Sequence, residues 1–257
     1  MFRIDLNCDM GESFGRYSLG LDDQVMPHIT SANIACGFHA GDPRVMHRTV
    51  GLACTNQVSI GAHPGLPDLV GFGRRRMECS PEEIRLDVLY QIGALQAFAR
   101  DQGTTLTHVK PHGALYHMVL ESETTAKAVA EAMGSFDPDL VLVTLAGPKG
   151  DAVADMAQKL GLTVAREAFP DRGYTPEGTL VPRHLEGALI QDPQTVASRA
   201  LNIARDQQVQ DLSGQMVSVQ ADTLCLHGDS HQAVELASAI RSLLEQNDVV
   251  LRPLRRV

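Results

Sequence analysis

The stretch FRIDLNCDMGE, residues 2–12, contains the pattern from which the fold of this chain is predicted. A short apolar run over residues 2–6 passes directly into acidic and polar side chains and then a glycine, as at the end of a β-strand. Other short apolar runs predict strands over residues 31–35, 58–61, 106–109, 140–145, 162–165 and 223–226, with 249–251 as a further candidate. The pattern therefore recurs along the whole chain.

Helical segments separate these runs. Ser80, Pro81 and Glu83 form a capping-box start, and Gly103 provides the stop of the helix that follows. Further helices are predicted from Asp42-Pro43, from Asp192-Pro193 and over residues 230–246. Strands that alternate with helices predict βαβ units and a parallel sheet. Seven or eight strands favour a single (β/α) barrel over residues 1–257, with a doubly wound open sheet as the alternative.

Composition excludes several classes of function. The formal net charge of −9 argues against nucleic acid as the main partner. The start, MFRIDLNCDM, does not resemble a signal peptide, and no apolar stretch reaches membrane-spanning length. The five cysteines are odd in number and form no CxxC pair, which argues against disulfides and a zinc ribbon. We therefore expect a cytoplasmic protein with no membrane partner.

Polar residues gather where the predicted strands end. In parallel α/β folds the carboxyl ends of the strands carry the active site. Four of the ten histidines lie there, each near a glycine: His39, His63, His112 and His227. The polar segments are DLNCDMGE (5–12), NIACGFHAGD (33–42), GAHPG (61–65), HVKPHGALY (108–116) and LHGD (226–229).

Each of these signals also has a plain structural interpretation. Asp9, His39 and His63 come from three neighbouring strand ends and predict a divalent-metal site, but a metal-free network of hydrogen bonds is the alternative. Asp5 and Asn7 fit a structural role as well as a functional one. Lys110 ends an apolar strand, where an unpaired charge is costly, so it needs a carboxylate or a substrate anion as its partner.

Two other segments are candidates for binding. The segment GFGRRR, residues 71–76, offers flexible backbone and three guanidinium groups suited to a carboxylate or a phosphate, although only one or two need to point inward. The long connection over residues 166–191 carries Glu167, Asp171, Arg172 and Tyr174 and is predicted to be an ordered lid. No Walker A motif is present and no GxGxxG follows a strand, so any ATP is bound unconventionally or by a partner.

Six segments together resemble the LamB/YcsF family, in order and at matching spacing over essentially the whole chain. The one small departure is Cys8-Asp9-Met10, where Ala-Asp-Leu is common in relatives, and it leaves the acidic position intact. The segments are DLNCDMGE (5–12), SANIACGFHAGDP (31–43), GAHPGLPDLVGFGRR (61–75), HVKPHGALY (108–116), FPDRGYTPEGTLVPR (169–183) and LCLHGDS (224–230).

The resemblance implies a seven-stranded (β/α) barrel similar to the glycoside hydrolase/deacetylase group. It also implies opening of the lactam of 5-oxo-L-proline to L-glutamate, with ATP as co-substrate and with 5-oxoprolinase subunits B and C as partners. Mg²⁺ or another divalent metal is a possible cofactor. Two other functions remain open from the residues: a metal-dependent amide deacetylase that acts alone, and a non-catalytic substrate-binding subunit.

The site residues are assigned on chemical grounds. Lys110 and His112 would stabilise charge on the lactam oxygen or the transferred phosphoryl group, and Glu167 or Asp229 would protonate the leaving nitrogen. Asp9, His39 and His63 would bind a metal or position and deprotonate the attacking water. The residues expected to bind substrate are Asp5, Asn7, Asn33, Arg74, Arg75, Tyr116, Arg172 and His227.

Overall fold

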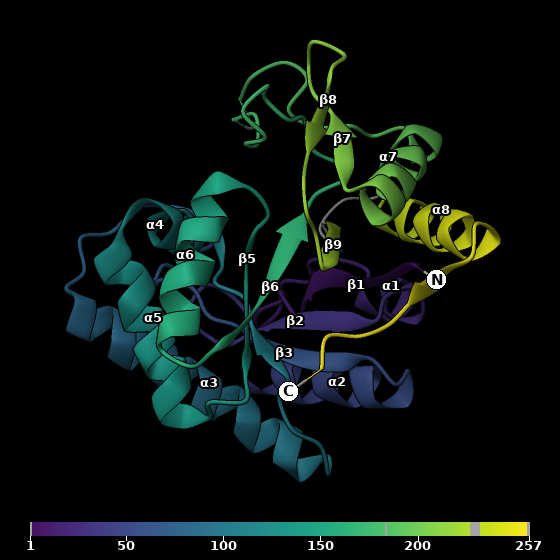
Figure 1. Cartoon of the computed structure of the whole chain (residues 1–257). Coiled ribbons are helices and arrows are strands. Elements are labelled where there is room, and N and C mark those ends of the chain that lie inside the picture. The colour runs from purple at the N-terminus through teal and green to yellow at the C-terminus, as the bar shows by residue number, and fades with distance from the viewer. Residues whose placement is uncertain (1, 183, 227–231, 256–257) are drawn as a thin grey trace.

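Seven parallel strands close into a barrel in the computed structural model, which describes residues 2–182, 184–226 and 232–255 (Figure 1). The strands pair in the order in which they are named, and β9 returns to β1, so the sheet has no open edge. The barrel prediction is thereby confirmed and the open-sheet alternative is wrong. The strands are β1 (Phe2–Met10), β2 (Ser31–Ala35), β3 (Ser59–His63), β4 (His108–Val109), β5 (Val141–Leu145), β6 (Thr163–Ala168) and β9 (Thr223–Leu226).

Strand β1 shows how the sequence divides between the two faces of the barrel wall. Its apolar side chains Ile4, Leu6, Cys8 and Met10 belong to the main hydrophobic core with residues of the surrounding helices. Because successive side chains of a strand point to opposite faces, Asp5, Asn7 and Asp9 face the barrel interior. The interior is therefore polar along this strand, and the main core lies between barrel and helices.

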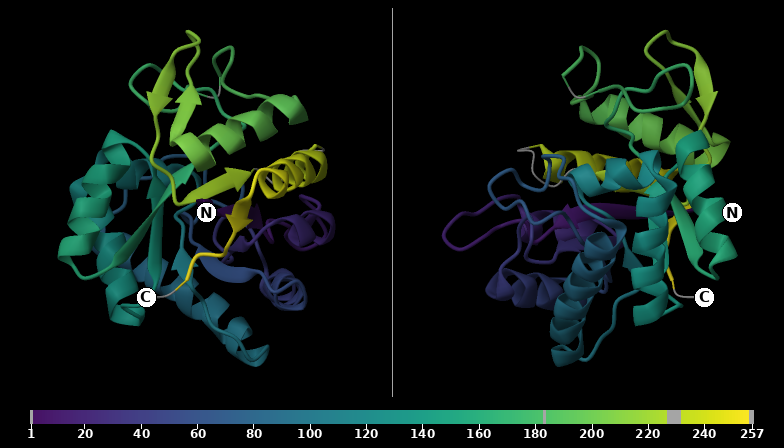
Figure 2. Two further views of the ribbon diagram at one scale, coloured as in Figure 1. Left: turned by 45° about the vertical axis from the view of Figure 1, so that its right-hand side comes forward. Right: turned by 90° about the vertical axis from the view of Figure 1, so that its left-hand side faces the viewer.

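Helices surround the barrel (Figures 1 and 2). Three of the predicted starts are confirmed: Asp42 accepts the backbone N–H groups of Arg44 and Val45, Ser80 forms a capping box, and Asp192 accepts from Thr195. α3 packs against α5, and α7 packs against α8. The helices are α1 (Asp22–Val25), α2 (Pro43–Thr55), α3 (Pro81–Asp101), α4 (Gly113–Glu121), α5 (Glu123–Phe136), α6 (Pro148–Lys159), α7 (Pro193–Asp206) and α8 (Ala233–Gln246), with a 3₁₀ turn η1 at Met26–His28.

The last described residues of the chain contact the barrel where β1, β2 and β3 begin. Strand β10 (Val249–Leu251) pairs in parallel with the first residues of β1. Beyond it, the backbone N–H of Leu254 donates to Ser31 Oγ, and its carbonyl accepts from Ser59 Oγ. The Leu254 side chain clusters with Val141, Val143 and Ala165.

A loop and a hairpin lie together at one end of the molecule, as the two views of Figure 2 show. Strands β7 (Gln208–Gln210) and β8 (Met216–Ser218) form an antiparallel hairpin that the sequence did not predict. In the long loop, Tyr174 is fully buried and its carbonyl accepts from Leu212 N–H at 3.0 Å. The sequence-based interpretation of this loop as an ordered lid stays a prediction. No helix in the described ranges has the length and apolar character needed to cross a membrane.

Candidate active site

A cavity of about 210 Å³ opens where several strands of the barrel end. Residues at or just after the ends of β1, β3 and β4 form one side, and the long loop after β6 contributes the other. The lining residues are Asp9, Glu12, His63, Arg74, Lys110, Pro111, His112, Gly113, Ala114, Tyr116, His117, Phe169, Arg172 and Leu180.

Lys110 lies at the floor of the cavity between two carboxylates. Its Nζ atom is 2.8 Å from Asp9 Oδ1, 2.7 Å from Glu167 Oε2 and 3.0 Å from Cys225 Sγ. Burial alone would lower the pKa of Lys110, but Asp9, Cys225 and Glu167 outweigh it and hold that pKa well above its ordinary value. Tyr116 donates its hydroxyl to Glu167 Oε1 at 3.1 Å. The expected partner for the lysine charge is therefore supplied by the protein, as a buried ion pair fixed at the cavity floor.

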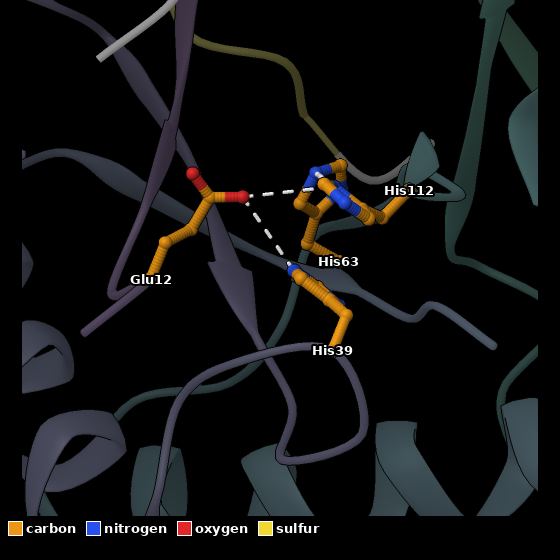
Figure 3. Close-up of side chains that lie close together, drawn as sticks. All are labelled: Glu12, His39, His63 and His112. Atoms are coloured by element: carbon orange, nitrogen blue, oxygen red, sulfur yellow. Dashed lines mark hydrogen bonds and ion pairs between the residues drawn. The ribbon is translucent and has the colours of Figure 1, made fainter. Parts of the chain in front are cut away.

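Three imidazoles and a carboxylate converge beside Lys110 (Figure 3). One ligand atom from each of Glu12, His39, His63 and His112 lies within 4.8 Å of the others, so this buried group could hold a metal ion. Glu12 Oε1 is 3.5 Å from His39 Nε2 and 3.6 Å from His112 Nδ1. The rings of His39 and His112 stack in parallel, with centroids 3.7 Å apart.

Backbone carbonyls fix the protonation of two of these rings. His63 Nδ1 lies 2.6 Å from the Lys110 carbonyl, and His112 Nε2 lies 2.8 Å from the Phe72 carbonyl. Because a carbonyl can only accept, both outer nitrogens carry the proton. The inner nitrogens, His63 Nε2 and His112 Nδ1, lie 3.0 Å apart and face the cluster. Metal-binding histidines are commonly oriented by such outer contacts, so the residues present fit a metal ion.

Burial keeps the rings of His39 and His112 neutral. It lowers the pKa of His112 to about 3, and the nearby His63 adds to the effect. The pKa of His39 is well below its ordinary value because of burial and then of His112 and His63. Asp9 behaves in the opposite way: burial would raise its pKa, but His63 and Lys110 hold it well below the usual value. The cavity thus combines neutral imidazoles with ionised carboxylate and ammonium groups.

The GFG segment holds the histidines through its backbone. Phe72 and Gly73 both have positive φ, of 56° and 64°. A Cβ on Gly73 would lie 2.8 Å from His39 Cβ and 2.9 Å from His112 Cδ2. Only glycine fits this close approach and backbone conformation, and the turn aims the Phe72 carbonyl at His112. The segment therefore supports the imidazole cluster, a role that its sequence did not indicate.

Below the cavity the barrel interior holds a second polar layer. Asp5 accepts from the hydroxyls of Thr30, Ser31 and Thr223. Asn7 donates to Thr223 at 2.6 Å and accepts from Asn33 at 2.7 Å. His108 Nε2 lies 2.9 Å from Asn33 Oδ1 and completes the chain of contacts. The side chains of Asp5, Asn7, Asn33 and His108 are at most 2% exposed, and they do not line the cavity.

Residues 4–257 of the chain match the LamB/YcsF family. The chain belongs to this family. It is 53% identical over 253 residues to the A subunit of 5-oxoprolinase from Pyrococcus horikoshii, a match that covers 98% of each protein. It is also 53% identical over 247 residues to the A subunit of 5-oxoprolinase from Syntrophobacter fumaroxidans, covering 96% of each.

Solved structures agree with the family assignment. The crystal structure of the lactam utilization protein from Thermus thermophilus superposes with a TM-score of 0.92 at 49% identity, over 97% of this chain and 99% of that one. A putative cellobiose-phosphate cleavage protein from Enterococcus faecalis, 11% identical, superposes with a TM-score of 0.62 over 98% of this chain and 97% of that one, which shows a shared fold alone.

The expected metal ligands of this LamB/YcsF protein differ from the group that converges. His39 and His63 belong to it, but the expected Asp9 does not, because Lys110 and Asn33 bind its Oδ1 at 2.8 and 2.9 Å. Glu12 was missed as a member of this group, although its position three residues after Asp9 and past the strand end was a usable signal.

The neighbouring residues Arg74 and Arg75 also differ in position relative to the cavity. Arg74 lines the cavity, whereas Arg75 pairs with Asp68 and two-thirds of its side chain is exposed. The expectation that Arg75 binds substrate therefore lacks support from its position. Arg172 lines the cavity but also donates to the carbonyls of Ala188 and Val181, which fixes the loop.

The remaining predicted residues fall into three groups. Lys110, His112 and Tyr116 line the cavity as expected, and Glu167 reaches it through Lys110. Asp5, Asn7 and Asn33 lie in the lower polar layer and do not line the cavity, although Asn33 also donates to Asp9 above it. We therefore leave them out of the proposed substrate site. His227 and Asp229 lie outside the described residues.

Proposed function

We propose that this chain is the A subunit of an ATP-dependent 5-oxoprolinase that opens the lactam of 5-oxo-L-proline to L-glutamate together with subunits B and C. The observation that carries the proposal is the full-length similarity to relatives named as the A subunit of 5-oxoprolinase, at 53% identity over 98% of both chains. The cavity is consistent with the proposal, since it is small and lined by charged groups suited to a compact polar substrate.

The proposed chemistry accounts for the need for ATP. A five-membered lactam is a stable amide, so its opening must be driven. In the proposed sequence the γ-phosphoryl group of ATP passes to the lactam oxygen, giving ADP and a phosphorylated imidate. Water then adds to the ring carbon, the carbon–nitrogen bond breaks, and the nitrogen takes up protons and leaves as the amine. A second water hydrolyses the resulting acyl phosphate to L-glutamate and phosphate.

The residues at the cavity have complementary parts in this sequence. Lys110 would stabilise negative charge that develops on the lactam oxygen or the phosphoryl group, a stabilisation typically worth a factor of about 10²–10³ per donor. His112 lines the same cavity, but its N–H donates to the Phe72 carbonyl, so we no longer assign it this role. Arg74 would bind the substrate carboxylate or a phosphate. Glu167 accepts from Tyr116 and pairs with Lys110 as a carboxylate, so it would pass a proton from the Lys110 ammonium group to the ring nitrogen.

Water activation is assigned to the other side of the cavity. His63 Nε2 has no proton in the tautomer set by the Lys110 carbonyl, so it can accept one from a water molecule. Asp9 Oδ2, 3.4 Å from this nitrogen, would stabilise the imidazolium that results. The alternative is a divalent metal ion held by Glu12 and the histidines: His63 Nε2 would then be a ligand, and the ion would lower the pKa of bound water in place of this base.

Reconstitution tests the proposal. We expect ATP-dependent formation of L-glutamate from 5-oxoproline when the chain is combined with subunits B and C, and no turnover by the chain alone. Activity of the chain alone would contradict the need for partners. No activity with all three subunits would contradict the substrate.

The histidine and glutamate cluster favours one second candidate, a metal-dependent amide deacetylase that acts without ATP. Release of acetate from small acetylated amines by the metal-loaded chain alone, with no glutamate formed by the complex, would establish it in place of the lactamase. A non-catalytic binding subunit predicts instead that replacement of Lys110 leaves turnover intact as long as substrate still binds.

A further inference from the structure

We propose that Glu12, His63 and His112 bind one divalent first-row transition cation of the Zn²⁺ type in preference to Mg²⁺, with His39 outside the coordination shell. The proposal deepens the function proposed above, because it names the cation of the same cavity. Its test measures metal binding and not turnover, so the cation-binding proposal and the proposed 5-oxoprolinase activity can each fail independently.

The first argument comes from the two inward nitrogens. His63 Nε2 and His112 Nδ1 face one another at 3.0 Å, while their outer nitrogens donate to carbonyls. Two lone pairs at this distance repel unless a cation lies beside both. The carboxylate oxygen of Glu12, 3.6 Å from His112 Nδ1, adds a negative charge to the same side. Two acceptor nitrogens and a carboxylate oxygen thus face one region, where a cation would interact with all three.

The spacing of these atoms suits a small cation. Ligand atoms about 2.1 Å from a tetrahedral ion lie about 3.4 Å from one another. The separations of 3.0 Å between the two nitrogens and 3.6 Å between His112 Nδ1 and Glu12 Oε1 fall on either side of that value. All the ligand atoms of the group, including the pair from Glu12 and His63, lie within 4.8 Å of one another.

The ring planes decide which histidines share the ion. An imidazole lone pair lies in the plane of its ring, and the planes of His39 and His112 are parallel to within 3°, with centroids 3.7 Å apart. One ion cannot lie in both planes. The ring of His63 is at 87° to that of His112 and at 90° to that of His39, so His63 can share an ion with either of them but not with both. The 3.0 Å contact between His63 Nε2 and His112 Nδ1 selects His112.

His39 then has a different task. It is fully buried, neither of its ring nitrogens has a hydrogen-bond partner within the part of the chain that is described, and its Nε2 is 3.5 Å from Glu12 Oε1. From this position it can orient the Glu12 carboxylate or a water molecule on the ion. We therefore assign His39 as a positioning residue.

Asp9 is unsuited to be the carboxylate ligand. Lys110 and Asn33 occupy its Oδ1 at 2.8 and 2.9 Å, and the buried ammonium group neutralises its charge. Its Oδ2 is 3.4 Å from His63 Nε2, but Asp9 does not belong to the group whose ligand atoms all lie within 4.8 Å of one another. Glu12 is thus the anionic ligand. Two imidazoles and one carboxylate form a donor set preferred by Zn²⁺, Co²⁺ and related ions, whereas Mg²⁺ prefers oxygen ligands and retains its water.

Titration of the metal-free full-length chain with Co²⁺ tests the proposal directly. We expect a visible absorption band of four- or five-coordinate Co²⁺ that saturates at one ion per chain. Zn²⁺ should abolish it at equimolar concentration, and millimolar Mg²⁺ should leave it in place. Absence of the band in the folded wild-type chain, or its loss with Mg²⁺, would overturn the proposal and leave a shared proton or an oxygen-preferring ion.

Variants test the ligand set. Glu12→Gln, His63→Gln and His112→Gln should each weaken Co²⁺ binding by more than about 100-fold, whereas His39→Gln, as an outer contact, should weaken it by about 10- to 100-fold and shift the band. His47→Gln, a change of an exposed histidine beside Asp101, is the matched control and should have no effect. If His39→Gln abolishes binding as fully as His63→Gln, the ion has four protein ligands and the assignment of His39 is wrong.

Discussion

The two polar layers of the barrel interior differ in the hydrogen-bond partners of their polar side chains. In the lower layer, Asp5, Asn7 and Asn33 exchange short hydrogen bonds with one another and with neighbouring hydroxyls, away from the cavity. In the upper layer, His63 and His112 direct acceptor nitrogens at each other, and Lys110 is held between two carboxylates beside open space.

This difference distinguishes polar residues with a structural role from those with a functional role, although both kinds lie on the same strands and have similar side chains. Buried polar groups with complete hydrogen bonds specify a unique barrel interior. The acceptor nitrogens of His63 and His112 face each other next to the Lys110 ammonium group, so they can bind a ligand. We therefore expect substitutions in the lower layer to change stability and substitutions in the upper layer to change turnover.

The largest effect is expected at Lys110. Lys110→Met should reduce ATP-dependent glutamate formation by the assembled complex by at least about 100-fold, because a donor at the developing charge is lost. It should also destabilise the chain by about 3–5 kcal/mol, since Asp9 and Glu167 lose their buried partner. Glutamate release and thermal unfolding measure the two effects. Lys127→Met on the exposed face of α5 is the control. Near-normal turnover in the folded Lys110 variant would remove Lys110 from the catalytic machinery.

A pH-dependent effect is expected from the lower layer. Burial raises the pKa of Asp5 from 3.8 to about 6, against the opposing effect of its hydroxyl donors. The folded state therefore binds the proton more tightly, and the free energy of unfolding should decrease as pH rises from about 4 to about 6, by up to about 3 kcal/mol. Urea unfolding across this range measures it. Asp5→Asn should flatten the dependence, and an unchanged pH profile in that variant would assign the effect to other groups.

A smaller change of stability is expected at Thr223, which joins Asp5 and Asn7 in the lower layer. Thr223→Val leaves both partners short of a hydrogen bond and should cost about 1–3 kcal/mol. The turnover of the folded fraction should stay within about threefold of the wild type. Thr55→Val, on the exposed side of α2, removes a hydroxyl that donates to Gly51 and should cost less than about 0.5 kcal/mol. A large loss of turnover in Thr223→Val would show that the two layers are not separate.

The smallest effect is expected at Cys225, although it lies in the upper layer. Its thiol is 3.0 Å from Lys110 Nζ, but burial raises its pKa well above the ordinary value, so it stays protonated and weakly nucleophilic. Cys225→Ser keeps an acceptor for Lys110 and should leave turnover within about tenfold of the wild type. Complete loss of turnover with unchanged folding would instead identify Cys225 as a nucleophile.

Much of the fold was accessible from local patterns. The capping box at Ser80 and the Asp-Pro starts at 42–43 and 192–193 act within one helical turn, so each predicted its helix correctly. The β7–β8 hairpin was missed because its strands are three residues long and mostly exposed, so they have no apolar run to reveal them.

The site was only partly accessible. Placement at strand ends identified Lys110, His63 and His112, because the carboxyl ends of parallel strands meet in one region whatever the details of packing. It could not separate Arg74 from Arg75, since neighbouring residues on a loop differ only in where the backbone directs them. It also could not predict that Lys110 would engage Asp9 and so leave Glu12 to face the histidines.

The sequence by itself determined the alternation of strands and helices, the family and the set of polar residues that meet at the barrel mouth, because these depend on local periodicity and on residues in fixed order. Only the tertiary structure decided which of those residues form hydrogen bonds and ion pairs with one another. A hydrogen bond between β1 and the residue that follows β4, or a carbonyl from the GFG turn aimed at His112, joins atoms far apart in the chain and depends on closure of the barrel to within a few tenths of an ångström.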